Sequence, residues 1–208
     1  MLKLRGLELD AAAVSFFEPP TGFAWIVKDA KKVDVPGGWD AKDVGNTRLD
    51  AECVVPTNDV PTLLTYRARN TAGETPPRTL RIMRPVDSQE EIEPNGGLRQ
   101  TQRISLGVAI RGRIQPDKDV DVYRCEVRAG VSYRVSVEAA RAGSLLDAVL
   151  LIHDERGRLL AMNDETEGAD PALTVSPSAD QMLFFSILDA HDRGSEWHGY
   201  SLTLSEAP

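Results

Sequence analysis

Short apolar segments with alternating side chains restrict this chain to a β-sheet architecture. In the segment 131–137 every second residue is valine or tyrosine and the residues between them are polar, so one face of an extended strand is apolar. The segment 200–204 alternates in the same way. Comparable runs recur along the chain and are bounded by Gly, Pro, Asn or Asp, whereas sustained helical periodicity is absent. This pattern predicts an all-β protein built from sandwiches.

A turn-rich segment divides the sequence into two parts. The 208 residues suffice for two domains of about 100 residues each. Residues 84–97 contain two prolines, two glycines and several acidic side chains, which is typical of a linker. The charge also changes there, from a net +1 over residues 1–85 to a net −9 over residues 86–208. We therefore predict two tandem β-sandwiches, with a boundary between residues 85 and 86.

Charge and hydropathy exclude two classes of partner. The net charge of −8 repels the phosphate backbone, so we expect no nucleic-acid partner. No apolar run approaches the roughly 20 residues of a membrane-spanning helix.

The two cysteines, Cys53 and Cys125, lie 72 residues apart and form no CxxC pair, so a structural zinc site is not expected. We interpret them as strand thiols, and a disulfide between them has no support in the sequence.

The motifs of common hydrolases are also absent. The chain has neither the HExxH of zinc proteases nor a G-x-S-x-G nucleophile elbow, and it has no glycine-rich phosphate loop. Ser195 lies near His191, Asp192 and His198 in the sequence. Clustering in one loop does not make a catalytic triad, which needs rigid supports and an oxyanion hole. We expect no catalytic residues, and a hydrolase is the unfavoured alternative.

Oxygen-bearing side chains are concentrated in two short segments of the second half. Glu91, Glu93 and Asn95 alternate in an extended segment and so point the same way. Asp119 and Asp121 alternate at the start of a predicted strand, with Asp117 just before them. Calcium takes six to eight oxygen ligands, several of them carboxylates. If the segments converge they form a calcium site; otherwise they are a solvated acidic linker and strand-capping aspartates, and the sequence leaves both interpretations open.

Five motifs of the second half stand in a recognisable order. They are Glu91–Asn95, Ile110–Ile114 with Asp119–Tyr123, Ala129–Val135, Ser144–Asp164 and Tyr200–Leu204. Together they resemble the bacterial pre-peptidase C-terminal domain, a jelly-roll-like β-sandwich appended to secreted proteases and other exported proteins. In the first half, Leu4–Leu9, Ala13–Phe16 and Thr62–Asn70 with Gly73 are similar to IPT/TIG-type immunoglobulin-like domains. That family has a further strand before the first of these pieces, so we expect this domain to lack its first strand.

The resemblance to the pre-peptidase C-terminal domain implies specific calcium ligands. In collagenase members calcium binds at the opening E-x-E-x-N segment and the Asp-rich strand start, which implies Glu91, Glu93, Asn95, Asp119 and Asp121 as ligands here. Calcium-binding members often carry another acidic residue directly after the asparagine, whereas this chain has Gly96 and Gly97. The departure puts occupancy of the site in doubt.

The resemblances lead to a functional expectation. We expect an accessory module without catalytic activity, conditioned by calcium, which binds or targets a protein or polymer outside the cell or at its surface. Other domains of a longer exported bacterial chain are expected partners, because no signal peptide precedes this segment. A purely structural spacer without a ligand is one alternative. A carbohydrate-binding module is another, suggested by Trp39 and Trp197 in predicted loops.

Overall fold

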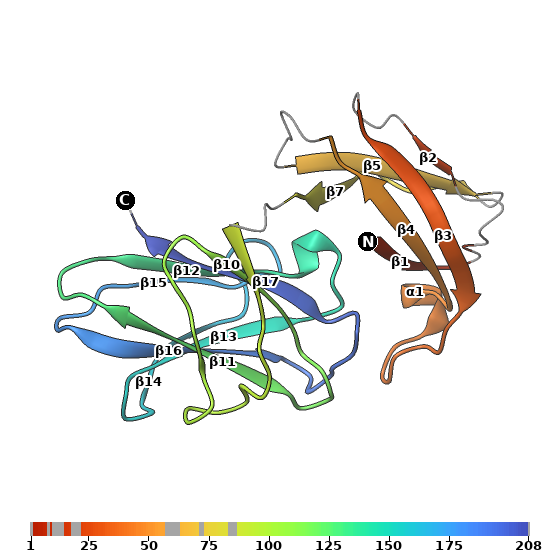
Figure 1. Ribbon diagram of the computed structural model, residues 1–208. Helices are drawn as coiled ribbons and strands as arrows, with labels where there is room; N and C mark the ends of the chain where they lie inside the picture. Colours follow the sequence, from red (N-terminus) through yellow and green to blue (C-terminus); the bar gives the residue numbers. More distant parts are fainter. Residues whose placement is uncertain are drawn as a thin grey trace. The chain divides into compact units, whose positions relative to one another are not determined.

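The protein is all-β, as the sequence predicts, and its strands form two pairs of sheets (Figure 1). The computed structural model describes residues 2–7, 9, 15–17, 22–56, 63–70, 73–82 and 87–207. Within it the chain divides into two compact units, Met1–Ile82 and Met83–Pro208. This division lies three residues before the predicted boundary.

The first unit contains two small antiparallel sheets. One has the strand order β1-β4-β3, and in the other β5 pairs with β2, β6 and β7. The strands are β1 (Leu2–Gly6), β2 (Ser15–Phe17), β3 (Ala24–Lys32), β4 (Thr47–Val54), β5 (Leu63–Asn70), β6 (Gly73–Glu74) and β7 (Arg78–Arg81). A single helical turn, α1 (Ala41–Val44), begins after Asp40, whose side chain accepts a hydrogen bond from the N–H of Lys42.

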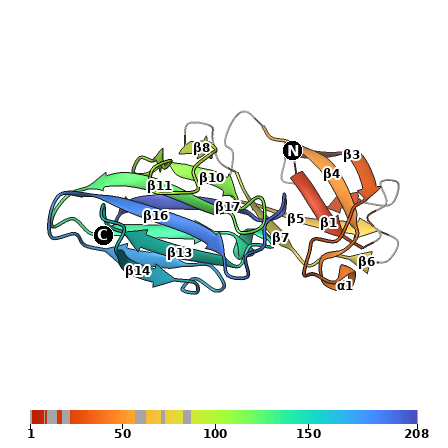
Figure 2. The same cartoon turned by 90° about the horizontal axis from the view of Figure 1, so that it is seen from below.

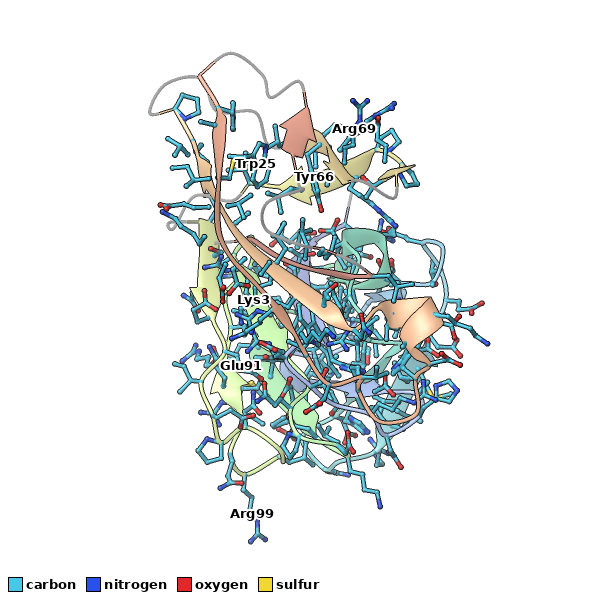
Figure 3. The ribbon with its side chains drawn as sticks, turned by 90° about the vertical axis from the view of Figure 1, so that its right-hand side faces the viewer. Lys3, Trp25, Tyr66, Arg69, Glu91 and Arg99 are labelled. Carbon is cyan, nitrogen blue, oxygen red and sulfur yellow. The ribbon has the colours of Figure 1, made fainter. Side chains whose placement is uncertain are left out.

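Among the described residues of the first unit, few side chains are fully buried. Leu49 and Ala51 of β4 and Leu64 of β5 are fully buried. The rings of Trp25 and Tyr66, one from each sheet, lie 5.5 Å apart between centroids at 50° to one another (Figure 3). The two sheets thus face each other as a small sandwich. The immunoglobulin-like assignment of this unit stays a prediction.

The second unit is a sandwich of two five-stranded sheets (Figure 2). One sheet has the order β15-β12-β17-β10-β8 and the other β14-β13-β16-β11-β9. Antiparallel pairs dominate, but β8 joins β10 and β9 joins β11 in parallel. The strands are β8 (Ser88–Glu90), β9 (Gln102–Arg103), β10 (Ala109–Arg113), β11 (Val120–Val127), β12 (Tyr133–Glu138), β13 (Ala148–His153), β14 (Leu159–Asn163), β15 (Ala172–Val175), β16 (Gln181–Asp189) and β17 (Gly199–Glu206).

Sequence alternation explains the core of the second unit. In β12 and β13 every second side chain is buried and the intervening ones are partly exposed, as the pleat of a half-covered strand requires. The buried residues of both sheets form one continuous apolar cluster. Its largest fully buried side chains include Tyr123, Tyr133 and Phe185. The predicted turn at Asp154–Gly157 joins β13 to β14, with Gly157 at a φ of 75°.

Candidate functional site

The segment after β8 crosses from one sheet of the second unit to the other. The N–H of Glu91, labelled in Figure 3, donates to the carbonyl of Arg111 in β10 at 2.9 Å. Four residues later, the carbonyl of Asn95 accepts from the N–H of Val122 in β11 at 3.0 Å. Residues 91–95 are therefore anchored to both sheets by backbone hydrogen bonds. This anchoring places their polar side chains beside the start of β11.

Three carboxylates converge at this crossing. One oxygen each from Glu91, Glu93 and Asp121 lies within 4.8 Å of the other two. Asn95 joins them, because its Nδ2 donates to Oε1 of Glu91 at 3.0 Å and its backbone N–H donates to Oε2 of Glu93 at 2.8 Å. The other oxygen of Glu91 accepts from the N–H of Arg113 at 2.8 Å. Four of the five predicted ligands are thus brought together.

Two oxygen atoms of this cluster are buried and accept no hydrogen bond from the described residues. They are Oδ1 of Asn95 and Oδ1 of Asp121, and both residues have no exposed surface. A buried polar atom without a partner costs about 1–3 kcal/mol. A hard cation bound by carboxylate and amide oxygens would satisfy both atoms. The donor set therefore fits calcium, as an all-oxygen group containing three carboxylates.

Two tyrosines hold Asp121 from the core side. The hydroxyl of Tyr200 in β17 donates to Oδ2 of Asp121 at 2.5 Å and also bonds the hydroxyl of Tyr123 at 2.6 Å. Burial, together with the neighbouring Glu91, raises the pKa of Asp121 to about 9. Burial likewise raises the pKa of Tyr200 well above its ordinary value. The carboxyl group of Asp121 therefore keeps its proton at pH 7 unless a nearby positive charge stabilises the ionised form.

Gly112 leaves the room that Tyr200 occupies. A Cβ atom at this position would lie 2.3 Å from the hydroxyl oxygen of Tyr200 and 2.9 Å from that of Tyr123. Both distances are far below van der Waals contact. Glycine is required here by the close approach of the two tyrosines.

The remaining predicted ligand, Asp119, lies outside the three-carboxylate group. Its Oδ2 accepts from the N–H of Gln115 at 2.7 Å and its Oδ1 from the N–H of Val120 at 2.9 Å. These bonds stabilise the turn that leads into β11. Each oxygen keeps a lone pair for a cation, so a ligand role for Asp119 stays a prediction. The neighbouring Asp117 accepts from the N–H of Gly194 at 2.8 Å.

The sequence interpretation missed Tyr123, Tyr200 and Gly112 as parts of this site. One signal was available, because Asp121 and Tyr123 are two residues apart in one strand and so point to the same face. Tyr200 gave no local signal, since it is 79 residues from Asp121. Its place depends on how the two sheets stack.

The loop before β17 places Ser195 beside His198 rather than His191. Oγ of Ser195 lies 2.8 Å from Nδ1 of His198 and also accepts from the N–H of Trp197 at 3.1 Å. His191 instead contacts Asp147, with 3.3 Å between Nδ1 and Oδ2. His198 is buried, and its Nε2 has no partner among the described residues. Ser195 thus closes a local turn in this arrangement.

The other candidates from the sequence are partly or fully covered. Cys53 and Cys125 are free thiols, and burial raises the pKa of both, which disfavours the reactive thiolate. Trp39 and Trp197 are both half-buried, so neither ring is fully exposed for stacking on a sugar. The described part of the chain holds no helix with the length and apolar character needed to cross a membrane.

Comparison with known proteins gives partial matches. No family model matches the chain. A probable subtilase-type serine protease of Deinococcus radiodurans is 31% identical over 108 residues. The match covers 50% of this chain and 14% of the protease, so the chain corresponds to a small part of that relative.

Two solved structures are similar at low sequence identity. The pre-peptidase C-terminal domain of a collagenase from Bacillus anthracis is 16% identical with a TM-score of 0.40, and the match covers 50% of this chain and 94% of that domain. A periplasmic inhibitor of g-type lysozyme from Aeromonas hydrophila is 15% identical with a TM-score of 0.41, covering 51% and 96%. The first is a member of the family that the motifs of the second half resemble. The resemblance of the first half to IPT/TIG-type domains stays a prediction.

Proposed function

We propose that this chain is a calcium-conditioned accessory region of a larger exported bacterial protein, without catalytic activity of its own. Its second unit binds or targets a protein or polymer outside the cell. The observation that carries the proposal is the convergence of Glu91, Glu93 and Asp121 with buried, unpartnered oxygens on Asp121 and Asn95. The partial match to a probable subtilase-type serine protease, which covers half of this chain and 14% of that relative, supports an accessory place in a longer chain.

Calcium would act by fixing the crossing segment to the sandwich. Without a cation, the charged carboxylates of Glu91 and Glu93 lie within 4.8 Å of one another beside the neutral Asp121, and their repulsion favours release of residues 91–95 from β11. A bound divalent cation would reverse this repulsion and satisfy Asn95 and Asp121. The residues that would hold it are Glu91, Glu93, Asn95 and Asp121. The cation would then stiffen the point where the second unit begins.

A non-catalytic role is also supported by the loop around Ser195. Its hydroxyl oxygen accepts a backbone N–H, and its partner His198 is buried. A nucleophile needs access to a substrate and an activating base that solvent or substrate can reach. We therefore propose no turnover by the isolated chain.

The test is thermal unfolding of the 208-residue chain in calcium, in magnesium and in excess chelator. Calcium at about 100 times its Kd stabilises the protein by about 2.7 kcal/mol, which raises the Tm by several degrees. The rise should be specific to calcium and absent in Glu93→Gln and Asp121→Asn. Asp164→Asn is the matched control, because Asp164 is exposed and forms no ion pair in the described part of the chain.

The binding part of the proposal has its own measurement. Co-sedimentation with insoluble collagen and with a cell-wall polysaccharide should show saturable binding to one of them that falls in chelator. A calcium-independent Tm would overturn the metal site. A calcium-dependent Tm without saturable binding would overturn the targeting role and leave a calcium-stiffened spacer.

A further inference from the structure

One end of the second sandwich holds a cavity of about 590 Å³ between the two sheets. Its volume lies within the range of about 300–1,000 Å³ that is typical of ligand pockets. Figure 1 draws the turn from β11 to β12 and the last residues of β17 at this same end of the unit. We call it the end cavity and define it by six of its lining residues: Ile104, Cys125, Val127, Tyr133, Gln181 and Glu206.

The floor of the end cavity is apolar. Ile104, Val127 and Tyr133 are at most 3% exposed, and Cys125 is 6% exposed. All four belong to the apolar cluster that fills the sandwich. The hydroxyl of Tyr133 already accepts a hydrogen bond from the N–H of Arg128 at 2.9 Å. The floor therefore favours an apolar group that would otherwise contact water.

Two polar side chains point into the end cavity from opposite sheets. Glu206 of β17 pairs with Tyr133 of β12, and Gln181 of β16 pairs with Val127 of β11. Residues directly opposite one another on neighbouring strands carry their side chains on the same face. Because Tyr133 and Val127 belong to the core, Glu206 and Gln181 also face the space between the sheets. Glu206 is exposed all the same, so its carboxylate lies at the mouth of the cavity.

The charges at the mouth are only partly compensated. Arg103 and Glu126 neutralise each other, with 3.1 Å between Nη2 and Oε1, and both side chains are 65% exposed. The other charged residues that line the cavity are Arg128, Asp180 and Glu206. None of these three forms an ion pair within the part of the chain that the structure describes. The mouth therefore presents two carboxylates and one guanidinium above an apolar floor.

We propose that the end cavity binds an α-ammonium group together with the apolar side chain next to it, as the first residue of a peptide presents them. The apolar side chain lies against the floor, and the ammonium group lies at the mouth beside Glu206. The amide oxygen of Gln181 is a second acceptor for it. A free α-amino acid carries the same two groups and adds a carboxylate, for which Arg128 is the partner. Hydrolysis of a peptide bond is the reaction that supplies either ligand.

This inference goes beyond the proposed function, because the end cavity is separate from the candidate metal site. Asp121 lies near the start of β11 and Val127 at its end. Six residues of extended strand place them about 20 Å apart. Ligand binding in the end cavity should therefore be the same in calcium and in chelator. Failure of the calcium site would leave this proposal standing, and the reverse also holds.

An NMR titration of the 208-residue chain with the peptide Leu-Gly-Gly amide tests the proposal. We expect saturable shifts of the backbone amides that line the end cavity, with a Kd of about 0.1–10 mM for so small a ligand. Acetylated Leu-Gly-Gly amide lacks the ammonium group, and Gly-Gly-Gly amide lacks the apolar side chain. Each should bind at least about fivefold more weakly. Absence of saturable shifts, or equal binding of the acetylated peptide, would overturn the proposal.

A pair of charge-removing variants tests the role of Glu206. Glu206→Gln keeps the size of the side chain and removes its charge, so the Kd for Leu-Gly-Gly amide should rise by about fivefold. Glu126→Gln is the matched control, because Glu126 lies at the same end but is already paired with Arg103. It should change the Kd by less than about twofold. Equal effects of the two variants would contradict a contact between the ammonium group and Glu206.

Arg128→Gln identifies the source of the ligand. A peptide amide has no carboxylate, so loss of the guanidinium should leave its affinity unchanged or raise it. Free leucine should lose about fivefold in affinity, because its carboxylate loses a partner. Tighter binding of leucine than of Leu-Gly-Gly amide to the unchanged chain, reversed by Arg128→Gln, indicates a free amino acid, and the opposite order indicates a peptide end. A loss of peptide affinity in Arg128→Gln would contradict the placement of the ammonium group beside Glu206.

Discussion

The hydroxyl of Tyr200 donates a 2.5 Å hydrogen bond to Oδ2 of Asp121, and this bond joins β17 to β11 across the second sandwich. The other oxygen of Asp121 accepts no hydrogen bond from the described residues. Tyr200 therefore fixes the orientation of a carboxylate that belongs to the candidate metal site. A residue of the core in this way determines the geometry of a site near the surface.

Tyr200→Phe tests this relationship directly. The change keeps the ring but leaves Oδ2 of Asp121 without its donor, so we expect a loss of about 1–3 kcal/mol in the free energy of unfolding. We also expect a smaller calcium-dependent rise of the Tm, because Asp121 is no longer held. Urea denaturation with and without calcium measures both effects.

Tyr133→Phe is the matched control for Tyr200→Phe. Tyr133 is equally buried, but its hydroxyl accepts from the N–H of Arg128 at 2.9 Å and touches no carboxylate in the described structure. It should lower stability and leave the calcium response intact. If both variants lose the calcium response equally, the orienting role of Tyr200 is wrong.

Gly112→Ala should be strongly destabilising. The new methyl group would lie 2.3 Å from the hydroxyl oxygen of Tyr200, so the tyrosine or the strand must move. Overpacking of this kind costs about 1–3 kcal/mol or more. Gly97→Ala is the control, because its Cβ would meet no atom within 4 Å. Equal stability of the two variants in thermal unfolding would contradict the packing argument.

The sequence predicted those features that depend on local pattern. Alternation over residues 131–137 predicted a half-buried strand, and β12 shows that pattern of burial. The turn at Asp154–Gly157 was also predicted, because Asp and Gly favour tight connections. The oxygen-bearing residues of the segment 91–95 were predicted to point the same way, which follows from the period of an extended chain.

Features that depend on stacking of the sheets were not predictable from the sequence. Tyr200 reaches Asp121 only because β17 and β11 face each other, and nothing near either residue indicates that pairing. Asp119 shows a second limit of prediction from residue spacing. Its spacing from Asp121 favoured a shared site, and that role stays a prediction, but the sequence did not show that its oxygens also bond the backbone of the turn before β11. Residue spacing predicts on which face of a strand a side chain lies. The local turn determines whether the oxygens of that side chain accept hydrogen bonds from backbone N–H groups.

Asp170 anchors the loop between β12 and β13. It is fully buried and accepts the N–H groups of Ala139, Ala140 and Arg141, as well as Nε of Arg141 at 2.7 Å. Asp170→Ala would leave the three amides and Nε of Arg141 without their acceptor, while the guanidinium keeps its ion pair with Glu167. We expect a loss of about 3 kcal/mol or more in the free energy of unfolding.

Hydrogen exchange and urea denaturation check the role of Asp170. The amides of residues 139–141 should lose protection first, since they lose their acceptor directly. Asp164→Ala is the control, because the exposed side chain of Asp164 has no such partners among the described residues. Unchanged protection of these amides would show that Asp170 does not anchor the loop.

His198 predicts a specific loss of stability in acid. Burial lowers the pKa of its imidazole below the ordinary 6.5, although the nearby Asp189 and Asp117 favour the charged form and Arg193 opposes it. The unfolded chain therefore binds more protons than the folded one between the folded pKa and 6.5. Stability from this group is complete above pH 6.5 and is lost as the pH falls toward the folded pKa, with a slope of at most about 1.4 kcal/mol per pH unit.

Urea denaturation of the calcium-free chain from pH 7.5 down to about 5 measures this slope. His198→Gln removes the titrating group, so its stability should fall less steeply over that range than that of the unchanged chain. His191→Gln is the control, because His191 is exposed. Its loss should leave unchanged the part of the pH dependence of the free energy of unfolding that comes from His198. Parallel curves for the unchanged chain and His198→Gln would mean that the buried imidazole takes up no proton before the protein unfolds, and the acid sensitivity would then belong to other groups.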